Sequence, residues 1–237
     1  MNLDNKQLKK MQIRDGFLAG LPIVIGYIPI AIAYGVLAKQ AGLSLVELTG
    51  MSLLVYAGAG QFMGAGMIGM GISAMEIIIA TFVLNFRHFI LSLSLTHQIS
   101  RFSKRAKLLL TTLLTDETFS VSSIHYEKAD KPYSNYFYGT IMITSYLSWV
   151  SGSFLGGILG DIIPAGLSQS MGVALYAMFI GLLIPSITKY KKIIWISLTA
   201  MVINFLVEPY IGQGWGIVVG TIIGATVGVF VLEEDKE

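Results

Sequence analysis

Few residues of this sequence could do acid–base or ion-binding chemistry, and most of them lie inside long apolar runs. They are Arg87 and His88 near the centre of residues 75–96, and Asp116 and Glu117 in the middle of residues 107–124. An arginine at the centre of a membrane-spanning helix costs about 2.5–3.5 kcal/mol on insertion scales, so it must face protein or water. We expect the two acids to be its partners, either in a structural ion pair or along a pathway for a substrate or a proton.

The polar residues near Arg87 bear on how its helix faces its surroundings. Asn85, His88 and Ser92 recur at helical spacing along one side, whereas Arg87 points about 200° away from Asn85. A helix that is polar on two sides cannot present either side to lipid. We therefore expect residues 75–96 to lie inside a helix bundle.

A stripe of hydroxyl residues crosses the segment that holds the two acids. It consists of Thr111, Thr115, Thr118 and Ser122, at positions i, i+4, i+7 and i+11 of a helix. Such a stripe is typical of a helix that lines a wet cavity, where a carboxylate could carry a proton. The alternative is a helix that begins near the membrane surface, with Thr115 as its N-cap and the acids in its first turn. The sequence leaves both interpretations open.

Two further groups of residues could expose backbone polar groups inside the apolar runs. Pro22 and Pro29, with Gly26 between them, are predicted to interrupt a helix, because proline removes a backbone donor and frees a carbonyl. Gly58 and Gly60 are predicted to do the same in the next run. Close packing of small residues between helices is the alternative for the glycines.

The polar neighbours of these glycines are harder to explain by packing alone. Tyr56 and Gln61 flank them in a run, residues 45–70, that is too long for one straight crossing. That run suits a broken or re-entrant helix at least as well as a tilted one.

Composition defines the elements that must position these residues. The chain has 237 residues, of which 54% are hydrophobic and 13% charged, against about 45–50% and 25% in soluble domains. Too few charged groups exist to solvate a soluble globule of this size, so we predict an all-α, polytopic membrane protein. The chain has no cysteine and only three scattered histidines. We expect no metal site, no cofactor and, at a net charge of +2, no nucleic-acid partner.

Hydropathy gives the number of segments. Eight apolar runs are separated by short connectors, at residues 17–38, 45–70, 75–96, 107–124, 136–160, 167–187, 192–207 and 212–232. They are too long for barrel strands. We predict six to eight transmembrane helices in a single domain, residues 1–237. The short connectors leave no linker for a second domain.

The basic residues predict how the chain is oriented. Lys and Arg cluster near residues 6–14, 101–107 and 189–192, and such clusters favour the cytoplasm. Three full crossings between residues 17 and 96 would put the second cluster outside. A re-entrant segment at residues 45–70 removes the conflict, so we expect an even number of crossings with both termini in the cytoplasm.

An internal repeat is a further possibility. Apolar runs in the halves 17–124 and 136–232 start about 120 residues apart, and Asn85 and Asn204 lie in similar contexts. Transporters often consist of two related halves with a site between them at mid-membrane.

Four motifs in order resemble the AzlC family, the large subunits of branched-chain amino acid exporters. They are Leu21-Pro22-Ile23-Val24-Ile25-Gly26-Tyr27-Ile28-Pro29 with Ala33-Tyr34-Gly35, Tyr56-Ala57-Gly58-Ala59-Gly60-Gln61-Phe62, Asn85-Phe86-Arg87-His88 with Ser92-Leu93-Ser94-Leu95, and Leu114-Thr115-Asp116-Glu117-Thr118-Phe119. Their order, their spacing and the chain length fit the family over nearly the whole chain. The second half carries no such motif, and Gly60 stands where many relatives have Ser or Ala.

The resemblance implies an exporter of hydrophobic amino acids with a small membrane partner of the AzlD type. We expect transport to be secondary-active and a bacterial inner membrane to be the location. An amino acid zwitterion needs a cation for its carboxylate, acceptors for its ammonium and an apolar pocket. The candidate binding residues are Tyr27, Tyr56, Gln61, Asn85, Arg87, His88, Asp116, Glu117 and Asn204. The buried acids and His88 motivate a hypothesis of proton-coupled antiport.

Three other functions remain as alternatives. A passive channel could be lined by Asn85 and Asn204, and a scaffold subunit would only support a partner. An intramembrane enzyme could use His88 with Asp116, but no nucleophile elbow, metal motif or phosphate loop favours catalysis. The absence of an ATP-binding motif means that transport would draw on a gradient or on a separate subunit.

Overall fold

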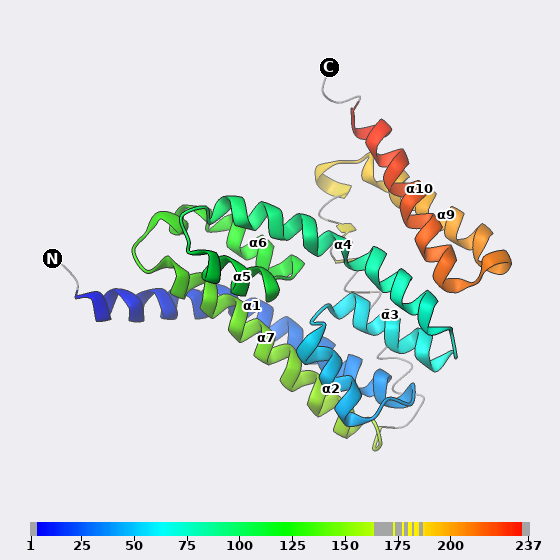
Figure 1. Ribbon diagram of the computed structural model, residues 1–237, viewed down its shortest axis with the longest axis horizontal. Helices are drawn as coiled ribbons and strands as arrows, with labels where there is room; N and C mark the ends of the chain where they lie inside the picture. The colour runs from blue at the N-terminus through cyan, green and yellow to red at the C-terminus, as the bar shows by residue number, and fades with distance from the viewer. Residues whose placement is uncertain are drawn as a thin grey trace.

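The protein is a bundle of helices of very different lengths (Figure 1). The computed structural model describes residues 4–163, 173, 177, 180, 181, 183, 184 and 187–233, and these contain helices and no strand. The elements are α1 (Asn5–Gln40), α2 (Leu45–Leu54), α3 (Gly58–Gly69), α4 (Ala74–Gln98), α5 (Lys104–Thr112), α6 (Asp116–Ile124), the 3-10 helix η1 (Tyr126–Asp130), α7 (Ser134–Leu159), α9 (Ile193–Ile211) and α10 (Gln213–Glu233). Among the described residues, α1, α4, α7, α9 and α10 are long and apolar enough to cross a membrane. The polytopic all-α fold is thus confirmed, and the predicted run 167–187 lies largely outside the described residues.

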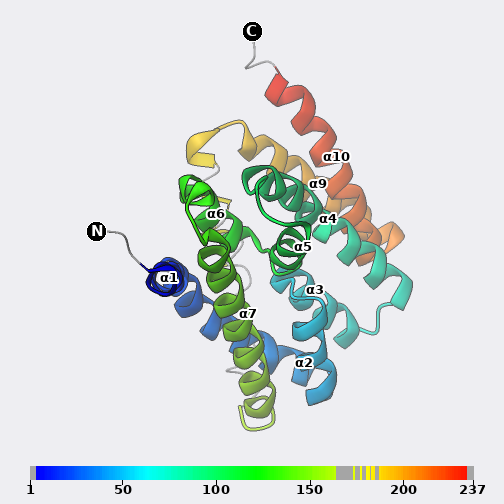
Figure 2. The same ribbon diagram turned by 60° about the vertical axis from the view of Figure 1, so that its left-hand side comes forward.

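Helices α1 and α7 pack along their lengths and form the core of the bundle (Figure 2). A Cβ on Gly20 of α1 would lie 3.4 Å from Ile141, and one on Gly152 of α7 would lie 2.7 Å from Ala31. Early residues of one helix meet early residues of the other, and Lys39 at the end of α1 pairs with Asp161 after α7. The two helices therefore run in the same direction.

The prediction that prolines break the first helix is wrong. Helix α1 continues through Pro22, Gly26 and Pro29 for 36 residues, which at 1.5 Å per residue is about 54 Å. Each proline removes one helical hydrogen bond, but the long contact with α7 holds the chain in helical conformation on both sides. Because a crossing needs about 20 residues, the polar first turns of α1 extend beyond the span.

Residues 45–70 form a hairpin of two short helices, which confirms the predicted break in that run and fits a re-entrant segment. Helix α2 ends at Leu54 and α3 begins at Gly58, with Tyr56 between them at a left-handed φ of 45°. A Cβ on Gly69, at the end of α3, would lie 3.1 Å from Ala41, just after α1. The hairpin therefore enters from the far end of α1 and returns to that same end.

Residues 107–124 are a second hairpin rather than one span. Helix α5 ends at Thr112, and α6 begins at Asp116 with Thr115 as its N-cap. The predicted continuous hydroxyl stripe does not form, because Thr111 lies on α5, whereas Thr118 and Ser122 lie buried on α6. The capping interpretation is confirmed, but the capped end lies inside the bundle.

Both basic segments of the first half lie at one end of the molecule. Lys9 of α1 lies over the ring of Tyr133, 5.0 Å from its centroid, and Arg101 after α4 pairs with Asp130 of η1 at 3.0 Å. Lys128 of η1 in turn pairs with Asp15 of α1. The α5–α6 hairpin therefore opens toward the end where α1 begins, opposite to the α2–α3 hairpin.

Helix α4 lies between α3 and the α9–α10 pair in both views (Figures 1 and 2). The prediction that it is enclosed on all sides is wrong for the described part of the chain, where Phe82, Phe86 and Phe89 are exposed on its outer face. Asn85 of α4 lies against Gly60 of α3, and Arg87 of α4 pairs with Asp116 of α6. Gly214, early in α10, lies against Glu76 near the start of α4, so these two helices start together.

Candidate functional site

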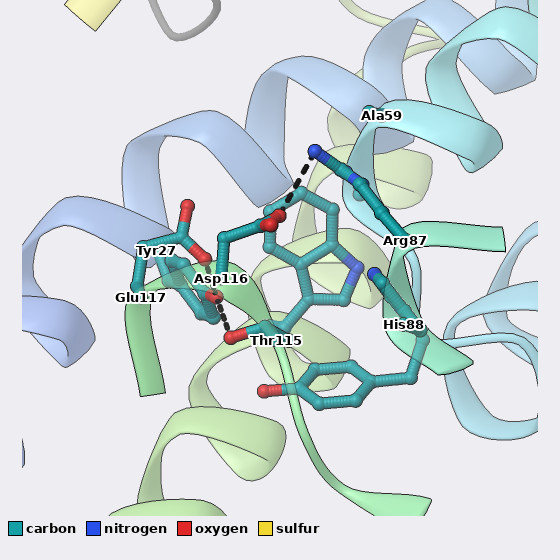
Figure 3. Close-up of a pocket in the computed structure, with 10 residues that line it drawn as sticks. Tyr27, Ala59, Arg87, His88, Thr115, Asp116 and Glu117 are labelled. Carbon is teal, nitrogen blue, oxygen red and sulfur yellow. Dashed lines mark hydrogen bonds and ion pairs between the residues drawn. The ribbon is translucent and has the colours of Figure 1, made fainter. Parts of the chain in front are cut away.

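Six segments converge on one cavity in the middle of the bundle (Figure 3). Its lining residues are Tyr27 of α1, Tyr56 of the α2–α3 break, Gly58 and Ala59 of α3, Arg87 and His88 of α4, Thr115, Asp116 and Glu117 at the start of α6, and Trp149 of α7. Arg87 lies near the midpoint of α4, so the cavity lies about halfway along a helix that is long and apolar enough to cross a membrane. The volume of the cavity is about 20 Å³, which accommodates roughly one water molecule. The cavity is therefore narrow in this structure.

The ion pair expected for Arg87 is present. Arg87 Nη1 lies 2.9 Å from Asp116 Oδ2, and both side chains are about one quarter to one third exposed (31% and 26%). Asp116 lies in the first turn of α6, where the helix dipole favours a negative charge. Two structural features, the cation on α4 and the helix terminus of α6, thus hold this carboxylate.

The second acid, Glu117, is held without a cation among the described residues. The Tyr27 hydroxyl donates to Glu117 Oε2 at 2.6 Å, and Thr115 Oγ1 lies 2.7 Å from the same hydroxyl. Tyrosine has one hydroxyl proton. Because Tyr27 donates that proton in its hydrogen bond to Glu117, Thr115 must be the donor in the hydrogen bond to Tyr27. Glu117 therefore lies beside the cavity with the hydrogen bond from Tyr27 as the interaction that holds its side chain.

Two donors at the cavity have no acceptor in the described part of the chain. Arg87 Nε and the Tyr56 hydroxyl are buried and unpartnered. The first turn of α3, from Gly58, has no side-chain cap, so its backbone N–H groups also point to an uncapped helix end. The cavity thus brings together unpaired hydrogen-bond donors and a carboxylate that has no cation partner among the described residues.

Three of the predicted binding residues lie away from the cavity. Gln61 is buried in a network with Trp149 and Ser52. Asn85 lies against Gly60, where a Cβ would come within 2.7 Å of its Nδ2. Asn204 packs on α10, where a Cβ on Gly216 would lie 2.7 Å from its Oδ1. Gly58 lines the cavity directly after the break, whereas Gly60 makes room for a neighbouring helix.

The lining residues that the sequence did not single out are Ala59, Thr115 as a wall of the site, and Trp149. Trp149 lies on α7 in a stripe with Ser145, Gly152 and Ser153, and these small residues at helical spacing are the signal of a closely packed face. That signal predicts packing, and it does not tell a site residue from a core residue.

The fold and this cavity define a polytopic membrane protein with a polar site between two helical hairpins. The family model described as AzlC protein matches residues 22–163, so the chain belongs to the AzlC family. All ten lining residues fall inside that match, whereas Asn204 lies outside it.

Relatives occur in bacteria and archaea. The inner membrane protein YgaZ of Escherichia coli is 30% identical over 183 residues, covering 76% of this chain and 75% of YgaZ. An uncharacterized membrane protein of Archaeoglobus fulgidus is 32% identical, covering 76% and 78%. The branched-chain amino acid transport protein AzlC of Bacillus subtilis is 28% identical, covering 76% and 69%. No solved structure matches the chain.

Proposed function

We propose that this protein is a secondary-active transporter that exports branched-chain and other hydrophobic amino acids. The name of the Bacillus subtilis relative supports the substrate class. The observation that carries the proposal is the arrangement of one cavity, in which Arg87 and Tyr56 have unmet donors and Glu117 has no cation among the described residues. An amino acid zwitterion presents the matching groups.

The carboxylate of the substrate binds the unpaired donors of the cavity in this proposal. Arg87 Nε and the Tyr56 hydroxyl donate to it, and the uncapped start of α3 adds backbone N–H groups and the positive end of a helix dipole. Discontinuous helices of known transporters bind anionic substrate groups with such half-helix termini. Asp116 already neutralises part of the Arg87 charge, so the substrate shares or displaces that partner.

The ammonium of the substrate binds Glu117. This carboxylate lies next to the cavity, and its hydrogen bond from Tyr27 leaves lone pairs on both oxygens. A charge-assisted hydrogen bond contributes about 1.5–3 kcal/mol. The charged groups thus fix the two ends that every amino acid has in common, and the surrounding apolar groups meet the variable side chain.

The small volume of the cavity favours a carrier over a static channel. Space for about one water does not hold an amino acid, so the walls must separate for loading. The two re-entrant hairpins open toward opposite ends of the bundle and meet at the cavity, which supports alternate access from the two sides.

Coupling, partner and orientation complete the proposal. Asp116, Glu117 and His88 are titratable groups lining the cavity, and they support exchange of the amino acid for a proton. Following the family resemblance, the protein works with a small AzlD-type membrane subunit in the cell inner membrane. The shared position of the basic segments supports a cytoplasmic N-terminus, and the C-terminus is proposed to lie there as well. We also propose that the chain forms a single domain that consists of two repeat halves.

Leucine efflux from preloaded cells tests the function. Wild type and Arg87→Ala are compared at matched membrane abundance, with and without the small partner. We expect saturable, partner-dependent efflux that Arg87→Ala abolishes. Non-saturating flux would indicate a channel, and intact transport in both Arg87→Ala and Asp116→Asn would indicate a scaffold. Transport in vesicles that is indifferent to an imposed pH gradient would exclude proton coupling.

A further inference from the structure

The indole of Trp149 forms one wall of the cavity, and the charged chemistry of the site does not use it. Trp149 is 2% exposed. Its ring meets Tyr27 edge-on, with centroids 5.3 Å apart, and is stacked on Tyr34 at 6.3 Å. A Cβ on Gly58 would lie 2.8 Å from Trp149 Cη2. Only glycine at that position leaves room for the indole to reach the cavity.

A closed ring of hydrogen bonds fixes this indole. Trp149 Nε1 donates to Gln61 Oε1 at 2.9 Å, and Gln61 Nε2 donates to Ser52 Oγ at 2.8 Å. Ser52 Oγ donates to Ser153 Oγ at 2.8 Å, and Ser153 Oγ donates to the carbonyl of Trp149 at 2.8 Å. Because an indole N–H can only donate, it also determines the orientation of the Gln61 amide.

These hydrogen bonds make the Trp149 indole a rigid wall of the site. Ser52, Gln61 and Ser153 are completely buried, so rotation of the indole would leave buried polar atoms unpaired, which is unfavourable. The ring links α2, α3 and α7, which places it on both sides of the α2–α3 break. When the cavity widens, the other walls must move.

Trp149 also lies close to the group that is proposed to bind the ammonium. Its ring contacts Tyr27, and the Tyr27 hydroxyl donates to Glu117. The side chain and the ammonium of an amino acid leave the same carbon atom. A substrate held at Glu117 and Arg87 therefore presents its side chain to a wall near these groups, and Trp149 has the largest side chain among the lining residues.

We propose that Trp149 sets the upper size limit for the substrate side chain and that Gln61 is its positioning residue. This inference rests on the proposed function. Once the other walls have moved apart, the fixed indole would leave space for branched aliphatic side chains and exclude aromatic ones. A smaller side chain at residue 149 would extend the cavity into the space that the indole now fills. Loss of the hydrogen bond to Gln61 would let the indole move and would make the size limit less strict.

Substrate selection is the first test. Efflux of phenylalanine and of leucine is measured for wild type, Trp149→Leu and Gln61→Met, with Trp195→Leu on the exposed face of α9 as the matched control. We expect Trp149→Leu to raise the ratio of phenylalanine to leucine efflux by about tenfold or more, and Gln61→Met to raise it less. The control should leave the ratio unchanged. An unchanged ratio in a Trp149→Leu protein that still exports leucine would overturn the inference.

Fluorescence is the second test, and it does not require removal of Trp149. The chain has three tryptophans, so Trp195→Phe with Trp215→Phe leaves Trp149 as the only one. Adding leucine to the purified full-length protein should change the Trp149 emission with the same concentration dependence as leucine transport. Adding Gln61→Met should shift the emission of the free protein. Unchanged emission at saturating leucine would contradict contact with the substrate.

The two proposals fail in different ways. If wild type exports neither leucine nor phenylalanine, the proposed function is wrong, and the inference is wrong with it. If wild type exports leucine but Trp149 neither senses it nor changes the selection, only the inference is wrong.

Discussion

Arg87 and Asp116 join the middle of a membrane-spanning helix to the start of a re-entrant one, with Nη1 and Oδ2 2.9 Å apart. The same guanidinium keeps a buried Nε without an acceptor among the described residues. One residue thus stabilises the meeting point of α4 and α6 and leaves a donor for a ligand. The effect of Arg87 on stability and its effect on ligand binding can be measured in separate experiments.

Removal of Arg87 should destabilise the protein more than removal of another paired arginine. Breaking a buried ion pair costs about 3–5 kcal/mol, whereas an exposed pair contributes about 0–1 kcal/mol. The partly buried Arg87 pair should fall toward the first range. Arg101 is the matched control, because it pairs with Asp130 at 3.0 Å with both side chains mostly exposed (75% and 64%). Thermal unfolding of Arg87→Ala and Arg101→Ala in detergent would measure this, and equal melting temperatures would contradict it.

Neutralising Glu117 should weaken substrate affinity without unfolding the chain. Glu117→Gln keeps an acceptor for Tyr27 but loses the charge that binds the ammonium. The loss of a charge-assisted hydrogen bond, about 1.5–3 kcal/mol, corresponds to a rise of about 10- to 150-fold in the apparent KM for leucine efflux. Tyr27→Phe removes only the neutral partner and should raise the KM less. A Glu117→Gln protein with wild-type KM would exclude Glu117 from binding.

Two glycines predicted alike as helix breakers should respond oppositely to alanine. At Gly26 no atom lies within 4 Å of the place that an alanine methyl would take, whereas at Gly58 that methyl would lie 2.8 Å from Trp149. Gly26→Ala should stabilise the helix by about 0.5–1 kcal/mol, and Gly58→Ala should destabilise the protein and reduce transport. Melting temperatures of the two variants in the same detergent provide the comparison. A fall for Gly26→Ala, or none for Gly58→Ala, would be inconsistent with these contacts.

The re-entrant hairpin predicts which loops face the same side of the membrane. The natural chain has no cysteine, so single cysteines report accessibility without further changes. Gln40→Cys and Met70→Cys should react with an impermeant maleimide from one side, and Ser100→Cys from the other. Labelling of Gln40→Cys and Met70→Cys from opposite sides would mean that residues 45–70 cross the membrane.

Local sequence features predicted much of the fold and part of the site. The low charge and the long apolar runs required a helical membrane fold, because a lipid environment forces backbone groups to pair within helices. Arg87 required a partner because an isolated charge is costly there, and the only acids in the middle of another run supplied it. Thr115 followed by two acids fitted a helix start, and the excess length of residues 45–70 fitted a hairpin.

Other features depended on contacts between distant segments. Whether Pro22 and Pro29 end a helix was decided by α7, which packs along both sides of them. The polar side chains of α4 indicated an enclosed helix. Asn85 lies against α3 and Arg87 pairs with α6, but phenylalanines of the same helix are exposed in the described part of the chain. Asn204 resembled Asn85 in local sequence, yet it packs on α10 and lies outside the site.

The sequence by itself determined the membrane class, the charged pair and the broken segments, because each follows from the cost of polar groups in lipid. Only the tertiary structure decided that Tyr27 reaches Glu117 and that Trp149 is held by Gln61. These contacts join residues 88 to 90 positions apart. Their formation depends on how the helices pack, and that packing minimises the free energy of the whole bundle rather than of any one segment.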